Sequence, residues 1–203
     1  MEHEKEVTAM TMKDRTKLMF AEALEKILET KPFDKVRVLD LCKLCETSPQ
    51  TFYYHFHDKY ELAAWVFLHD FAYIVVDAEP EYSPERITEM TKHMESRRTF
   101  YQRAYNDHSQ NTVNKYIFDF NVKNAVSIVK AVSVEEHLTT EQIIAIKYHT
   151  YGVMGLFYEL IYETLEMNAE EMSAFLYEKT PDFLKSAFAG YSYKSEEILY
   201  SDK

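Results

Sequence analysis

The sequence predicts an all-α fold, and three observations support this prediction. Apolar side chains recur every three or four residues along most of the chain, as they do on one face of a helix. Glycine and proline contribute only 3 and 5 of the 203 residues, whereas β-sandwiches and barrels need them at each turn. Capping residues also mark several helix starts. We expect helices over residues 11–30, 36–45, 49–55, 58–76, 84–95, 97–106, 110–132, 140–166 and 169–189, with a bend in the last one at Pro181.

Local chemistry sets the helix boundaries. Pro32 ends the first helix, because the residue before a proline avoids the helical region. Ser48 and Pro49 start the third helix, with serine as N-cap and proline in the first helical position. Three pairs have the spacing of a capping box and open later helices: Asp58 with Glu61, Thr139 with Gln142, and Asn168 with Glu171.

No flexible linker interrupts this helical pattern. We therefore expect an N-terminal three-helix domain, residues 11–62, that continues through the long fourth helix into a C-terminal helical domain, residues 63–203. The first domain would hold a helix-turn-helix.

Acidic charge is concentrated in the second domain. The formal charge is −11, and residues 1–60 carry 10 basic and 11 acidic side chains, against 13 and 23 in residues 61–203. This balance argues against nonspecific coating of nucleic acid but permits a small DNA-reading face in the near-neutral first domain. No apolar run is long enough to cross a bilayer, and residues 1–10 contain no secretory signal. We expect a cytoplasmic protein that does not contact a membrane.

Residues 36–59 contain the most informative pattern. Two short helices joined by a tight turn form a helix-turn-helix, and Phe52 and Phe56 can anchor the second helix to the core. The rest of that helix surface carries amide, hydroxyl and imidazole groups, which suit phosphates and base edges. The helix is about 10 Å long, short enough to enter a major groove end-on. The DNA backbone would pass near Arg37, Lys43, Ser48 and Lys59.

This stretch resembles the TetR family of transcriptional regulators. The resembling residues are Val36-Arg37-Val38-Leu39-Asp40-Leu41-Cys42 and Ser48-Pro49-Gln50-Thr51-Phe52-Tyr53-Tyr54-His55-Phe56-His57-Asp58-Lys59-Tyr60-Glu61-Leu62. A second match, Tyr151-Gly152-Val153-Met154-Gly155-Leu156-Phe157, looks like a motif of one TetR subgroup, which includes regulators resembling the dihydroxyacetone-kinase activator.

The resemblance implies a mechanism and a set of contacts. Similar proteins dimerise through the C-terminal domain and bind a palindromic operator in double-stranded DNA as homodimers. A small ligand or a partner protein regulates them through the same domain. By motif position, DNA contacts are expected from Thr51, Tyr53, Tyr54, His55 and Lys59, with Gln50 as the candidate for reading a base.

Two positions depart from the family pattern. The family commonly has Ala-Gly-Val before the serine, where this chain has Cys45-Glu46-Thr47. A non-glycine residue in a left-handed turn costs roughly 1 kcal/mol, so Glu46 implies a modified turn or tolerated strain. The family often has threonine in place of Arg37, which removes a helix cap and adds a cation.

Residues 143–165 are apolar nearly all round, so this helix needs partners on more than one side. One partner would be its own domain and the other the same helix of a second subunit. Gly152 and Gly155 would allow close approach in such an interface, with Leu156 and Leu160 beside them. The alternative is a fully buried central helix in a monomer.

Aromatic side chains are abundant in the C-terminal domain. They could line a pocket for a small apolar ligand, although stripes of this kind are more often plain core. The residues concerned are Phe100, Tyr101, Tyr105, Tyr116, Phe118, Phe120, Tyr148, Tyr151, Phe157 and Tyr158.

Two function classes remain open. The first is the DNA-binding regulator. The second is a helical interaction protein or co-regulator that kept the fold but lost DNA reading, a reading motivated by the acidic second domain and by Glu46. We expect no enzyme, metal or cofactor: Cys42 and Cys45 could form half of a zinc site, but no second Cys or His pair has fitting spacing, and no nucleophile–base set or phosphate loop is evident.

Overall fold

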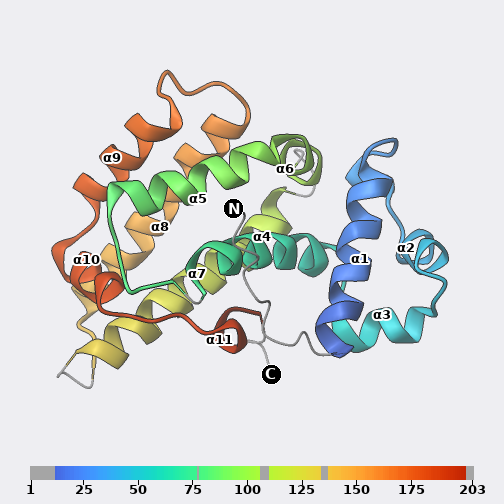
Figure 1. The fold of residues 1–203 in the computed structure, drawn as a ribbon, viewed down its shortest axis with the longest axis horizontal. Helices are drawn as coiled ribbons and strands as arrows, with labels where there is room; N and C mark the ends of the chain where they lie inside the picture. Colours follow the sequence, from blue (N-terminus) through green and yellow to red (C-terminus); the bar gives the residue numbers. More distant parts are fainter. Residues whose placement is uncertain (1–11, 77, 106–109, 134–136, 200–203) are drawn as a thin grey trace, which may run out of the picture.

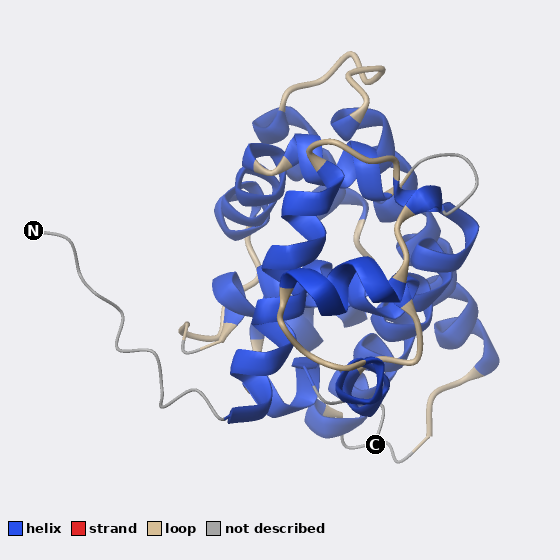
Figure 2. Ribbon diagram, turned by 90° about the vertical axis from the view of Figure 1, so that its right-hand side faces the viewer, coloured by secondary structure: helices blue, strands red, loops and turns tan. Residues whose placement is uncertain are grey.

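The computed structural model describes residues 12–76, 78–105, 110–133 and 137–199, and these ranges form helices and loops without a β-strand (Figures 1 and 2). The all-α prediction is therefore confirmed. Residues 1–10, which were expected to lack a secretory signal, lie outside the described ranges. None of the helices in these ranges is long and apolar enough to span a bilayer.

Three helices form a compact head at one end of the molecule, on the right in Figure 1: α1 (Met12–Leu28), α2 (Val38–Leu44) and α3 (Pro49–His55). A single turn of 3₁₀ helix, η1 (Phe33–Lys35), connects α1 to α2. The head is built around three phenylalanines. Phe20 of α1 and Phe52 of α3 are fully buried, with ring centroids 5.2 Å apart, and Phe56 is 2% exposed. The predicted anchoring role of Phe52 and Phe56 is confirmed.

Helix α4 (Lys59–Val75) leaves the head and enters the second region. There it packs against α7 (Gln110–Val132), which packs in turn against α8 (Thr140–Ile161). Helix α5 (Pro84–Ser96) lies along α9 (Ala169–Lys179), and the short α6 (Arg98–Ala104) sits between α1 and α8. The chain continues through α10 (Asp182–Ala189), which packs on α7, to α11 (Ser195–Leu199), which packs on α4.

The structure differs from the predicted boundaries near the C-terminus. Residues 169–189 are not one bent helix: the chain leaves the helical conformation at Thr180 (φ −66°, ψ 130°), and α10 begins after Pro181. The residue before a proline favours this extended region, so the proline breaks the helix. Helix α8 ends at Ile161 rather than 166, and the short α11 was not anticipated.

Candidate nucleic-acid interface and ligand cavity

Helix α3 has two faces of opposite character. Phe52 is fully buried, whereas Tyr53 and Tyr54 beside it are 59% and 68% exposed. The Phe52 and Phe56 rings, 5.7 Å apart, fix the buried face of the helix. The two tyrosines therefore project from a rigid support and bury little of their own surface in this chain. Neither tyrosine is packed in the core.

The N-terminus of α3 carries exposed polar groups. Ser48 caps the helix, since its Oγ accepts a hydrogen bond of 3.2 Å from the Thr51 backbone N–H, and the two hydroxyl oxygens lie 3.1 Å apart. Ser48 and Gln50 are exposed, and Thr51 and His55 are half-buried. The structure thus brings Ser48, Gln50, Thr51, Tyr53 and Tyr54 together at the outer end of one short helix.

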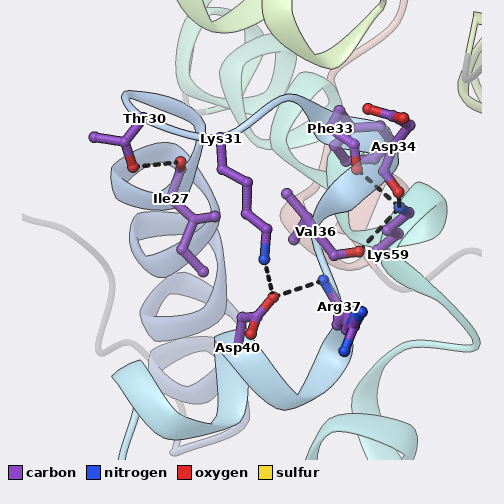
Figure 3. Close-up of polar contacts among 9 residues, drawn as sticks. All are labelled: Ile27, Thr30, Lys31, Phe33, Asp34, Val36, Arg37, Asp40 and Lys59. Atoms are coloured by element: carbon purple, nitrogen blue, oxygen red, sulfur yellow. Dashed lines mark hydrogen bonds and ion pairs between the residues drawn. The ribbon is translucent and has the colours of Figure 1, made fainter.

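The Lys59 ammonium is held by the segment between α1 and α2. Its Nζ donates to three backbone carbonyls of the η1 segment, those of Phe33 (2.8 Å), Asp34 (3.1 Å) and Val36 (3.0 Å), as Figure 3 shows. An ammonium group has three N–H donors, and all three are engaged. Burial lowers the pKa of Lys59, which accords with this enclosed position. Lys59 therefore supports the loop between α1 and α2, and its contact with DNA stays a prediction.

Arg37 begins α2 and remains exposed. Arg37 has no hydroxyl to cap α2, as a threonine at this position would. The Asp40 carboxylate instead accepts the Arg37 backbone N–H at 3.1 Å, and it also pairs with Lys31 (Figure 3). Among the described residues, no carboxylate pairs with the Arg37 guanidinium. Arg37 and the exposed Lys43 are therefore cations on the α2 side of the head.

The turn between α2 and α3 has the left-handed residue that a glycine would favour, although this residue is Glu46. Glu46 has φ 50°, in the left-handed region. Thr47 N donates to Cys42 O at 2.9 Å and Glu46 N to Lys43 O at 3.3 Å, the two bonds of a Schellman motif. Of the two possibilities raised by the sequence, the structure shows tolerated strain rather than a modified turn. The Glu46 carboxylate is exposed beside α3.

Cys42 and Cys45 are packing residues of the head. Cys42 is 3% exposed, and Cys45 Sγ donates weakly to Met19 O at 3.5 Å. Burial raises the pKa of Cys45 to about 11, which keeps the thiol protonated at neutral pH. Metal binding requires the thiolate, and no group of three potential ligands occurs in the part of the chain that the structure describes.

A cavity of 210 Å³ lies within the second region, between α4, α5, α7, α8 and the segments that follow α8. Its wall is mainly apolar. Of the aromatic residues named from the sequence, Tyr105, Phe157 and Tyr158 line it, Phe100 and Tyr101 lie in the core, and Tyr148 and Tyr151 are exposed.

The polar residues of this cavity wall were not predicted from the sequence. Asn114, Asn121 and Asn124 line it from α7, and His149 lines it from α8. Burial lowers the pKa of His149, which favours the neutral imidazole. The available signal was the spacing of the asparagines, which places all three on one side of a helix.

Helix α6 connects the cavity region to the head. Gln102 Nε2 donates to Ile161 O at the end of α8 (2.8 Å), and Arg103 Nη1 donates to Leu28 O at the end of α1 (2.6 Å). Just before α6, Arg97 pairs with Glu25 of α1 and with Asp70 of α4, whose side chain is 2% exposed. Asp70 also accepts the Tyr101 hydroxyl at 2.5 Å, and burial raises the pKa of Tyr101 well above its ordinary value.

The outer face of α8 carries large apolar side chains in solvent. Ile144, Tyr148 and Tyr151 are 60%, 82% and 66% exposed. Gly152 and Gly155 lie on this face, and a Cβ at either position would meet no atom within 4 Å. Leu156 is half-buried, whereas Leu160 is 5% exposed and packs inward against Met172 and its neighbours.

Comparison with known proteins assigns both regions. Residues 21–66 match the model of bacterial regulatory proteins of the tetR family, and residues 81–181 match that of a transcriptional regulator C-terminal region of the TetR type. The chain is 24% identical over 91 residues to the HTH-type dhaKLM operon transcriptional activator DhaS of Lactococcus lactis subsp. lactis (strain IL1403). That match covers 44% of this chain and 49% of the relative, so it spans about half the relative's length.

A solved structure of a dihydroxyacetone kinase operon activator DhaS covers 88% of this chain and 98% of its own, with a TM-score of 0.48 and 18% identity. The two family models match successive regions, which correspond to the three-helix head and to the segment from before α5 to the end of α9. The chain belongs to the TetR family of bacterial transcriptional regulators.

Proposed function

We propose that the chain is a homodimeric regulator that binds a palindromic operator through α3 and responds to a small molecule in the C-terminal cavity. The observation that carries the DNA-binding part is the orientation of Tyr53 and Tyr54, which project outward from a helix anchored by Phe52. Exposed aromatic groups with hydroxyl tips cost solubility, so a surface that holds them rigidly is suited to a partner. Operator DNA would place this activity in the bacterial cytoplasm.

The surrounding residues support docking in a major groove. The first turn of α3 presents Ser48, Gln50 and Thr51, which would meet phosphates and base edges at the groove. Arg37 and Lys43 on α2 would face the backbone on one side of α3. His55, half-buried behind Tyr54, would position that ring, since the two rings lie at 90° with centroids 5.0 Å apart.

The exposed face of α8 supports a homodimer. Ile144, Tyr148, Tyr151 and Gly155 follow at intervals of four, three and four residues, which places them on one stripe. A second copy related by a two-fold axis would cover the same stripe on both subunits. In this proposal Gly152 and Gly155 allow close approach and Leu156 lies at the edge, while Leu160 supports the helix from beneath.

Selection from a genomic DNA library tests the proposal. We expect the full-length dimer to enrich a palindrome, with an affinity that falls steeply as salt rises. Tyr54→Ala should weaken operator binding about tenfold, because an alanine there removes both a contact to base edges and a phosphate donor. Tyr73→Ala is the matched control, since Tyr73 on α4 has the same 59% exposure as Tyr53 but lies outside the head.

A helical interaction protein is the second candidate. The exposed Glu46 carboxylate beside α3 and the acidic second domain favour it. Failure to enrich any palindrome at low salt, together with a stable stoichiometric protein complex, would support this candidate over the regulator.

A further inference from the structure

We infer that the effector of this regulator is an uncharged molecule with an apolar body and one edge of hydrogen-bonding groups, and that Asn114, Asn121, Asn124 and His149 recognise this edge. The inference rests on the proposed ligand-responsive function and specifies the chemistry of its ligand. It starts from the polar part of the cavity wall, which the described structure leaves without partners.

The three asparagines form one polar stripe. Positions 114, 121 and 124 are separated by seven and three residues, so they share one side of α7 over a length of about 15 Å. All three side chains are half-buried and line the cavity. Each amide has two N–H donors and a carbonyl acceptor, and none makes a hydrogen bond within the described ranges.

Two further polar groups on the cavity wall also make no hydrogen bond within the described ranges. His149 is half-buried, with no hydrogen bond among the described residues, and its lowered pKa favours the neutral ring with one donor and one acceptor. Tyr105 lines the cavity at 5% exposure, and its hydroxyl is buried with no hydrogen-bond partner in the described structure. Buried polar groups are normally satisfied, so the Tyr105 hydroxyl, together with the four half-buried polar side chains on the same wall, points to a ligand.

The charged residues on the lining exclude an ionic ligand. Arg86 and Glu81 are the charged lining residues in the described ranges. Arg86 donates to Glu89 Oε2 at 2.7 Å and lies 3.4 Å from Glu81 Oε2, so two carboxylates already compensate the guanidinium. An anion would find no free cation here, a cation would have to compete with Arg86 for its two carboxylates, and either would lose its hydration.

The rest of the wall sets the shape of the ligand. Apolar side chains of α4 and α5 also line the cavity, including Phe67, Phe71, Ile87 and Met90. A ligand that satisfies both parts of the wall is therefore amphipathic, with its amide, carbonyl or hydroxyl groups on the α7 edge.

Four probes of nearly identical shape test this chemistry: benzamide, benzoate, benzamidinium and α-methylstyrene. They present an uncharged amide, an anion, a cation and an apolar group on the same ring. Binding to the full-length, DNA-free protein at neutral pH is measured by ligand-observed NMR. We expect millimolar binding of benzamide, about tenfold weaker binding of α-methylstyrene, and weaker binding still of the two ions.

Variants identify the recognising residues. Asn121→Leu/Asn124→Leu keeps the number and branching of the side-chain heavy atoms and should abolish most of the preference for benzamide over α-methylstyrene. Tyr82→Phe is the matched control, because Tyr82 lines the same cavity but its hydroxyl is already 2.8 Å from Thr180 Oγ1. The control should retain the preference.

Thermal unfolding without ligand gives a second readout. The asparagine variant loses no internal hydrogen bond and should have a Tm equal to or above that of the wild type, whereas Tyr82→Phe should have a lower Tm. A fall in Tm for the asparagine variant would show that the amides are structural and overturn the inference.

Three binding results would also overturn it: an ion that binds as tightly as benzamide, equal binding of benzamide and α-methylstyrene, or no binding of any probe. Operator binding measured on the same preparation separates this inference from the proposed function. A protein that selects a palindrome but fails the probe test remains a DNA-binding regulator with a different ligand chemistry.

Discussion

The head and the cavity region both contain polar side chains on their helices, but these side chains face solvent in the head and the interior in the cavity region. On α3, tyrosine, glutamine and threonine side chains face solvent around a buried phenylalanine, and Tyr54 is 68% exposed. In the cavity region, asparagine, histidine and tyrosine side chains face inward, and Tyr105 is 5% exposed. Composition alone cannot separate these regions, because what differs is which side of the helix carries the polar groups.

This difference separates the two proposed partners. A polar surface that projects outward can reach an extended partner such as DNA, whereas one that lines a cavity of about 210 Å³ is suited to a small molecule. The residues between the regions are equally informative. The ion pairs of Arg97 and the hydrogen bonds of α6 join α1 to the cavity region without an intervening linker.

The largest expected effect concerns this junction. Arg97→Met leaves the Asp70 carboxylate, 2% exposed, without its main cation, and should lower the free energy of unfolding by about 3–5 kcal/mol. Urea denaturation monitored separately in the head and in the cavity region should show both signals shifting together. Arg98→Met is the control: Arg98 pairs with two more exposed carboxylates, so its loss should cost about 1 kcal/mol or less.

If Arg97→Met shifted only one of the two transitions, the head and the cavity region would be independent folding units. Their opposite orientation of polar side chains would then distinguish two separate domains rather than two parts of one cooperative unit.

Lys59 tests which residues of the head belong to its DNA-binding surface. Lys59→Met removes three hydrogen bonds from an ammonium to carbonyls and should lower the free energy of unfolding by about 2 kcal/mol. Lys35→Met, whose ammonium is 71% exposed, should cost less than about 0.5 kcal/mol. Unchanged stability of Lys59→Met together with loss of operator binding would return Lys59 to the DNA-binding surface.

Substitution of Glu46 tests how its left-handed backbone and its negative charge affect stability and operator binding. Glu46→Gly relieves a left-handed backbone and should raise the free energy of unfolding by about 1 kcal/mol. It also removes a negative charge beside α3, so operator affinity should rise, most clearly at low salt.

Glu163 provides the matched control for Glu46, because it has φ 57° just after α8 and lies outside the three-helix head. Glu163→Gly relieves the same strain but also breaks the ion pair with Arg98, and it should leave operator affinity unchanged. Equal effects of both substitutions on DNA binding would contradict the role assigned to the Glu46 charge.

The smallest expected effect is a dependence on pH inside the cavity region. The pKa of His149 is lowered by burial, so below about pH 6.5 the unfolded chain binds more protons than the folded one. Stability should therefore fall as pH drops through this range, and His149→Phe should make the fall shallower. Chemical denaturation at pH 8, 6.5 and 5.5 measures both slopes, and identical slopes would contradict a desolvated imidazole.

Features set by neighbouring residues could be predicted from the sequence. Ser48, Asp58, Thr139 and Asn168 all accept the expected capping bonds from backbone N–H groups two or three residues ahead. The outward orientation of Tyr53 and Tyr54 followed from the spacing of Phe52 and Phe56, which fixes the buried side of α3.

Features set by residues distant in the chain could not be predicted from the sequence. The carbonyls that accept from Lys59 lie 23 to 26 residues earlier in the chain, so its motif position could not reveal its partner. Pro181 could bend a helix or break it, and the break is accompanied by the bond of Thr180 to Tyr82, 98 residues away. The asparagine spacing on α7 was visible in the sequence, but only the packing of α4, α5 and α8 shows that it faces a cavity.

The position of α6 has a consequence for protein engineering. Arg103 satisfies a carbonyl at the end of α1, and Arg97 holds Glu25 of the same helix, so a fragment cut within α4 would lose both groups. The head is therefore not a portable module. A chimaera that transplants its operator preference onto another sensor should carry residues 97–103 with it, or graft only the outer positions of α3 onto a recipient that has its own support.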